Sequence, residues 1–116
     1  MENLIEKYNW GEWKPFPDPR NGEYLFAPFG YGVYQLRNIE TNEFVLFGSS
    51  NNLAFRMSSL LPKPLGQGTR KKEEKRIYIL NNLSYIEYRT VAFLKKEHMT
   101  KCEWILKNGN NHLFNS

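Results

Sequence analysis

Cysteine and histidine are nearly absent from this chain of 116 residues, which has one cysteine and two histidines. The single cysteine, Cys102, excludes an internal disulfide. Together with His98 and His112 it supplies too few ligands for a structural zinc site, which usually needs four. Any metal in this protein must therefore be held by oxygen atoms.

Long apolar runs are also missing from the sequence. No segment approaches the roughly 18 consecutive apolar residues of a membrane-spanning helix. Residues 1–10, MENLIEKYNW, lack the basic and then apolar order of a secretory signal. We therefore expect a cytoplasmic protein with no membrane partner. The length fits one domain, since single domains commonly hold about 100 to 200 residues.

Acidic residues are outnumbered by basic ones, 12 against 16, which gives a net charge of +4. This excess is a mild bias toward polyanionic partners such as DNA. The densest basic segment is RKKEEKR, in which the candidate nucleic-acid-binding residues are Arg70, Lys71, Lys72 and Arg76. The alternative is a solvated helix face on which glutamates and lysines are neighbours.

Prolines and tryptophans gather in the first quarter of the chain. Residues 9–28 contain four prolines and two tryptophans, and proline at this density disfavours regular helices and central strands. We expect residues 1–29 to form an irregular arm that is pinned by Trp10, Trp13 and Phe16, and residues 30–116 to form the domain. Core packing is the favoured role of these aromatic side chains, and contact with bases or with a protein partner is the alternative.

Beyond the arm, β-branched and aromatic runs alternate with segments of helical periodicity. Pro62 ends one of the helical segments, and Ser50 or Asn51 can cap its start. The order β-β-α-α-β-α predicts an α+β domain with a small, mainly antiparallel, three-stranded sheet and flanking helices. The pattern predicts strands over 33–37 and 43–47, a helix over 52–61, a second helix from 69 to 81 or 82, a strand over 83–93 and a helix over 95–108.

Two charged residues lie beside the apolar arcs of their helices. Arg56 falls at the margin of an arc between Leu53 and Leu60, and Glu103 is next to an arc that includes Cys102. Arg56 can extend its charge into solvent or donate hydrogen bonds to an anion. Glu103 can form a salt bridge or bind a metal ion. The two can also pair with each other, or they can lie on either side of a phosphate and its cation.

Three segments, GVYQL, LFGSSNNLAFR and EWILKNGNNHLFN, resemble the motifs of the GIY-YIG nuclease family. The resemblance covers about residues 30–115, and the predicted order of elements agrees with that fold. The spacing from the glycine to the arginine is its most specific part. The matching positions are Gly32, Val33, Tyr34, Gly48, Ser50, Asn52, Leu53, Arg56, Glu103 and Asn115.

The resemblance implies a metal-dependent endonuclease that hydrolyses phosphodiester bonds in DNA. Glu103 would hold a single Mg²⁺ or Mn²⁺ ion, and Arg56 would bind the phosphate that is cut. Tyr34 would help to deprotonate the attacking water, and Asn115 would brace the site. The resemblance also marks structural residues of the motifs, namely Gly32, Gly48, Ser50 and Asn52.

Two positions depart from the family pattern. Leu46 replaces the tyrosine that opens the second motif, and Leu60 replaces a histidine or tyrosine that follows the arginine. Neither leucine can transfer a proton or donate a hydrogen bond. These departures favour the alternative to an enzyme, a module that keeps the fold and binds nucleic acid or protein without catalysis.

Overall fold

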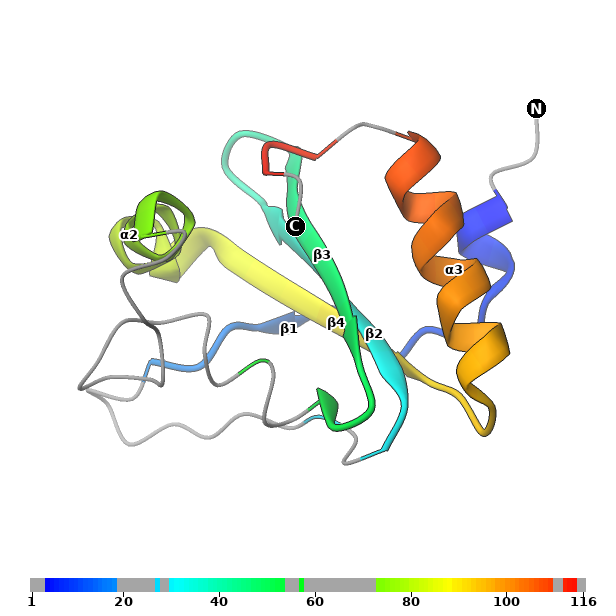
Figure 1. The fold of residues 1–116 in the computed structure, drawn as a ribbon. Coiled ribbons are helices and arrows are strands. Elements are labelled where there is room, and N and C mark those ends of the chain that lie inside the picture. The colour runs from blue at the N-terminus through cyan, green and yellow to red at the C-terminus, as the bar shows by residue number, and fades with distance from the viewer. Residues whose placement is uncertain are drawn as a thin grey trace.

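The computed structural model describes residues 4–18, 27, 30–53, 57, 73–109 and 112–114. They form an α+β structure, as predicted (Figure 1). No helix in these ranges has the length and apolar character needed to cross a membrane. The elements are the 3-10 helix η1 (Leu4–Lys7), β1 (Lys14–Pro15), β2 (Gly32–Asn38), β3 (Glu43–Ser50), α2 (Glu73–Asn81), the 3-10 helix η3 (Leu83–Tyr85), β4 (Ile86–Ala92) and α3 (Lys96–Gly109).

The strands of the described residues form one antiparallel sheet in the order β1-β4-β2-β3. The sequence predicted three of these strands and an irregular arm, so β1 is a correction. Lys14 pairs with Tyr88, and the backbone amide of Phe16 donates to the carbonyl of Ile86 over 2.9 Å. Pro15 is tolerated because β1 is an edge strand, on which one side needs no hydrogen bonds.

The predicted hairpin is confirmed as β2 and β3. Its turn begins at Asn38, whose side-chain oxygen accepts hydrogen bonds from the amides of Glu40 and Thr41. Asn42 has φ 59°, a left-handed conformation that asparagine tolerates better than most residues. The predicted strand over 83–93 begins with η3 and continues as β4, and the predicted last helix matches α3 to within one residue at each end.

The two remaining predicted helices are described only in part. Of residues 52–61, Leu53 and Met57 are helical and buried, and residues 54–56 and 58–61 lie outside the described residues. Of residues 69–81, the structure describes α2 from Glu73 to Asn81. The predicted end of this second helix is therefore confirmed, whereas its start stays a prediction. The division of the chain at residue 30 also stays a prediction.

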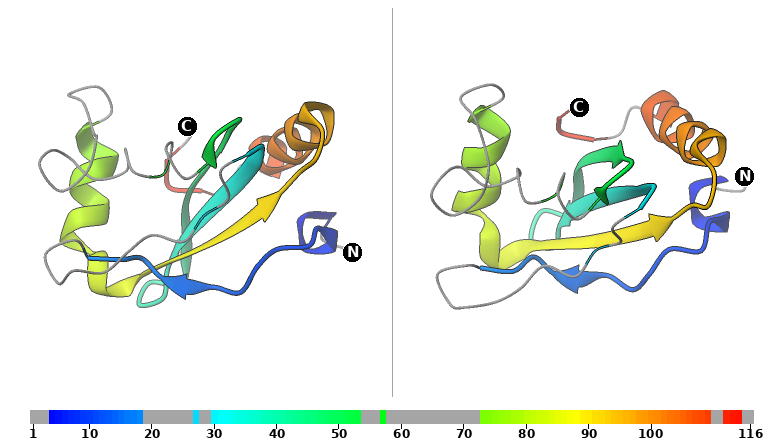
Figure 2. Two further views of the ribbon diagram at one scale, coloured as in Figure 1. Left: turned by 90° about the horizontal axis from the view of Figure 1, so that it is seen from below. Right: turned by 60° about the horizontal axis from the view of Figure 1, so that its bottom comes forward.

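Helices α2 and α3 pack on opposite sides of the sheet: α3 lies along β2 and β3, whereas α2 lies beside the start of β4 (Figures 1 and 2). Successive side chains of a strand point to opposite faces, and the two buried clusters follow this alternation. One cluster joins Tyr34 and Leu36 of β2 to Ile79 of α2. The other joins Val33 of β2 and Phe47 of β3 to three residues of α3, namely Met99, Cys102 and Leu106.

The glycines of the two motifs leave room for neighbouring side chains. Gly48 lies opposite Tyr34 in the hairpin, and a Cβ at Gly48 would be 2.6 Å from the Tyr34 hydroxyl oxygen and 2.7 Å from Cε1 of its ring. A Cβ at Gly32 would be 2.7 Å from a methyl group of Leu53. Both separations are shorter than van der Waals contact, so a larger residue at either position would displace a buried side chain.

Replacing Gly48 with alanine should therefore lower the free energy of unfolding by about 1–3 kcal/mol, the usual cost of overpacking a core. Urea denaturation of the wild type and of the Gly48→Ala protein would measure this loss of stability. Gly30→Ala is the matched control, because no atom lies within 4 Å of a Cβ added there. Equal stability of the Gly48→Ala and Gly30→Ala proteins would contradict the packing of Tyr34 against Gly48.

Candidate metal and phosphate site

The carboxylate of Glu103 lies beside the end of β3. Glu103 is half-buried in the middle of α3, and the Ser49 hydroxyl donates a hydrogen bond to its Oε2 atom. Ser49 pairs with Val33, which belongs to the cluster under α3. The contact therefore joins α3 to the last residues of β3. The sequence placed Glu103 near the apolar arc of α3, but it did not indicate Ser49 as its partner.

The turn after β3 is organised by its own polar groups. The Ser50 side-chain oxygen accepts a hydrogen bond from the backbone amide of Asn52 over 3.0 Å, and the amide of Leu53 donates to the carbonyl of Gly30 over 3.3 Å. The first bond is of the kind expected from a residue that caps a helix start. It fixes the chain directly after the Ser49–Glu103 contact. Asn52 itself is exposed.

Tyr34 and Glu103 are not brought together. Tyr34 is fully buried in the cluster on the α2 face of the sheet, and Leu46 is fully buried in the same cluster. Glu103 contacts Ser49, the neighbour of Gly48, and successive strand residues face opposite ways. The Tyr34 ring and the Glu103 carboxylate therefore lie on opposite faces of the sheet.

The other predicted site residues are mostly beyond the described chain. Arg76, in α2, is only 8% exposed, so its guanidinium has little surface to offer a phosphate. The remaining candidates, as well as Leu60, lie outside the described residues: Arg56, Arg70, Lys71, Lys72 and Asn115.

A buried arginine on the α3 face was missed by sequence reasoning. Arg89 of β4 is 5% exposed, and its guanidinium lies 4.3 Å from the ring centroid of Trp10 and 4.7 Å from that of Trp13. Its Nε donates to Gln35 Oε1 over 2.8 Å, and its terminal nitrogens donate to both oxygens of Glu6 over 2.8 and 3.0 Å. Arg89 therefore attaches the N-terminal residues to the sheet.

Hydrogen bonding and burial set the charge states of two groups near Arg89. Hydrogen bonding to Arg89 holds the pKa of Glu6 below its usual value. Since Gln35 Oε1 accepts from Arg89, its Nε2 donates to His112 Nε2 over 3.1 Å, which places the imidazole proton on Nδ1. Burial lowers the pKa of His112 to about 4, so this histidine is neutral at pH 7.

The candidate site offers single oxygen donors and no preformed cluster of metal ligands among the described residues. No group of three or more histidine, cysteine, aspartate or glutamate side chains able to hold a metal ion occurs in the described ranges. Burial raises the pKa of Cys102 to about 12, so its thiol stays protonated and is a weak nucleophile. The partly exposed carboxylate of Glu103 and the hydroxyl of Ser49 are hard donors beside the motif turn.

Comparisons of the chain with protein-family models, with curated proteins and with solved structures gave no match.

Proposed function

We propose that this protein is a divalent-metal-dependent endonuclease of the GIY-YIG type that hydrolyses phosphodiester bonds in DNA. The Ser49–Glu103 hydrogen bond is the observation that carries the proposal. It holds the carboxylate that matches the family's metal ligand at the turn leading to Arg56. We also propose that residues 52–61 form the first of two helices, which would complete the order β-β-α-α-β-α.

Glu103 would hold Mg²⁺ or Mn²⁺, and the donor atoms are suited to such a hard cation. When bound, the cation would neutralise charge on the phosphate and make a coordinated water more acidic. Ser49 would fix the rotamer of Glu103 through Oε2. The other oxygen, Oε1, has no hydrogen-bond partner among the described residues and would face the ion. Arg56 would donate hydrogen bonds to the phosphate oxygens, where its permanent charge is most useful.

Tyr34 takes a different role in this proposal from the one that the resemblance implies. Its full burial on the α2 face favours support of the backbone at Gly48 over contact with the attacking water. Gly48 is the residue before Ser49, so the Tyr34 ring would keep Ser49 in register with Glu103. Tyr34 would then be a positioning residue for the metal ligand.

The burial of Tyr34 and Leu46 also supports a second candidate function. The motif positions that would transfer protons, Tyr34 and Leu46, both lie in an apolar cluster on the face opposite Glu103. A protein with this arrangement can bind DNA or a protein partner through its basic surface without cutting DNA. The net charge of +4 fits DNA binding of this kind.

The two functions are separated by one assay. The protein is incubated with supercoiled and with branched DNA in Mg²⁺, in Mn²⁺ and in EDTA, and the products are resolved on gels. The enzyme should nick or cut DNA with either cation and not in EDTA. A DNA-binding module should retain DNA without cutting it, with an affinity that falls by about 0.9 log units per log unit of salt for each phosphate contact. Retention without cleavage would overturn the proposed nuclease.

A further inference from the structure

Helix α3 presents a tryptophan to solvent. Trp104 is 64% exposed, an unusual state for a side chain that buries much apolar area in most proteins. Trp10 and Trp13, by contrast, are each covered by the guanidinium of Arg89. No ring or cation–π contact of the Trp104 indole is found within the described residues. Trp104 therefore has a free aromatic surface next to Glu103 in the chain.

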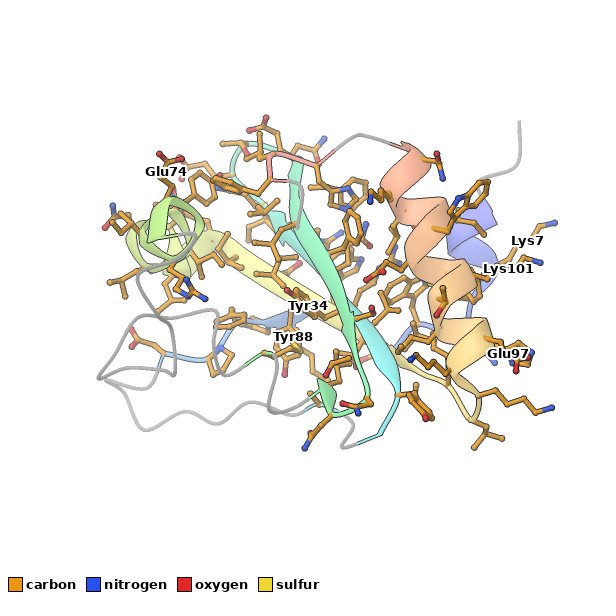
Figure 3. All side chains as sticks on the ribbon, in the orientation of Figure 1. Lys7, Tyr34, Glu74, Tyr88, Glu97 and Lys101 are labelled. Atoms are coloured by element: carbon orange, nitrogen blue, oxygen red, sulfur yellow. The ribbon has the colours of Figure 1, made fainter. Side chains whose placement is uncertain are left out.

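The exposed side of α3 is basic. Lys96, Lys101 and Lys107 are exposed, and Glu97 is the one exposed acidic residue of this helix. In Figure 3, Lys101 of α3 and Lys7 of η1 both extend toward the outer side of the molecule. Positive charge beside an exposed aromatic ring is the combination with which proteins bind single-stranded nucleic acid. The lysines contact phosphates, and bases stack on the ring.

The basic residues also connect Trp104 to the proposed metal site. Residues three or four positions apart are neighbours on a helix, and Lys107 follows Trp104 by three positions and Glu103 by four. At 100° per residue, the positions of Lys96, Lys107 and Thr100 fall on the arc between Glu103 and Trp104. A DNA strand that runs across this arc from Glu103 would therefore contact the lysines first and the Trp104 indole last.

We propose that this face of α3 binds a single-stranded segment of the DNA substrate, with Lys96 and Lys107 at its phosphates and an unpaired base stacked on Trp104. The inference deepens the proposed function. It assigns the substrate class as DNA with unpaired bases close to the cleaved bond, such as a flap or a fork. Since an α-helix with its side chains is about 10–12 Å across, the stacked base belongs to a nucleotide near the one at Glu103.

Binding is tested in EDTA, which prevents cleavage, by the fluorescence anisotropy of a labelled single-stranded oligonucleotide and of its duplex. Trp104→Ala should weaken binding of the single strand by about tenfold or more, with little change for the duplex, and Trp104→Phe should restore most of the affinity. Lys107→Ala should reduce the slope of log affinity against log salt by about one. Tyr85→Ala is the matched control, because Tyr85 is an exposed aromatic residue in η3.

Cleavage of a flap substrate is also measured in Mg²⁺. Together with the affinities, it distinguishes failure of the single-strand binding site from failure of the proposed nuclease, on which this inference rests. Loss of single-strand affinity in Trp104→Ala supports the inference, even if the protein does not cut. Cleavage by the wild type combined with equal single-strand affinity of the wild type and Trp104→Ala overturns the inference and leaves the nuclease standing. The inference is also overturned if Trp104→Ala loses equal affinity for duplex and single-stranded DNA. It is overturned as well if the wild type binds no single-stranded DNA.

Discussion

Replacing Glu103 with glutamine should lower the rate of DNA cleavage by about a hundredfold or more. Enzymes lose about this much rate when one group that stabilises charge in the transition state is removed. Glutamine retains a side-chain oxygen that can accept the Ser49 hydrogen bond. The packing of α3 on β3 is thereby kept, while the negative charge that would hold the cation is lost. The rate would be measured as nicking of supercoiled DNA in Mg²⁺.

Glu97→Gln is the matched control for this result. Glu97 lies on the same helix, is exposed and loses the same charge on substitution. Its cleavage rate should remain close to that of the wild type. Both variants should unfold at nearly the wild-type temperature, which excludes a general effect on folding. Equal cleavage by Glu103→Gln and the wild type would show that the observed activity does not use Glu103.

Arg89→Met should lower the free energy of unfolding by about 2–4 kcal/mol. The substitution removes the donor to the buried Gln35 side-chain oxygen, and an unsatisfied buried polar group costs about 1–3 kcal/mol. It also removes the guanidinium from the faces of Trp10 and Trp13, each contact being worth about 0.5–2 kcal/mol. Glu6 is 52% exposed and can be hydrated instead. The midpoint of urea denaturation would measure the loss.

Arg37→Met tests whether the large loss of stability expected for Arg89→Met depends on burial of the arginine. Arg37 makes the same kinds of contact but is more exposed. Arg37 also lies over Trp13, at 4.1 Å, and pairs with Glu87. Its side chain is 37% exposed, however, so water can replace much of what the guanidinium supplies. The loss for Arg37→Met should stay below about 1 kcal/mol. Equal losses of unfolding free energy for Arg37→Met and Arg89→Met would contradict the inference that burial makes Arg89 the more important residue for stability.

The elements that could be predicted are those whose pattern is local. Met99, Cys102 and Leu106 recur at helical spacing, and this periodicity located α3 to within one residue at each end. The hairpin was equally visible, because two β-rich runs flank a polar turn. Strand β1 was not predicted, since it has two residues, one of them Pro15. Its pairing with β4 depends on residues more than seventy positions away.

The site could be predicted only as far as the motif residues. The spacing of the motifs selected Tyr34, Gly48 and Glu103, but it carries no information about which face of the sheet α3 covers. That face is set by the strand register, which places Ser49 under α3 and Tyr34 on the other side. The partner of Arg89 in β2, Gln35, is 54 positions away and is likewise invisible to local patterns.

The proposed binding of a metal ion by Glu103 beside the end of β3 can be tested by adding Mn²⁺ to isotopically labelled protein. The paramagnetic ion broadens the NMR signals of nearby amides. We expect the amides of Ser49, Ser50 and Glu103 to broaden first, the amide of Ile79 on the opposite face to stay sharp, and Glu103→Gln to abolish the broadening. Broadening that is absent at these residues, or that is unchanged in Glu103→Gln, would contradict the claim.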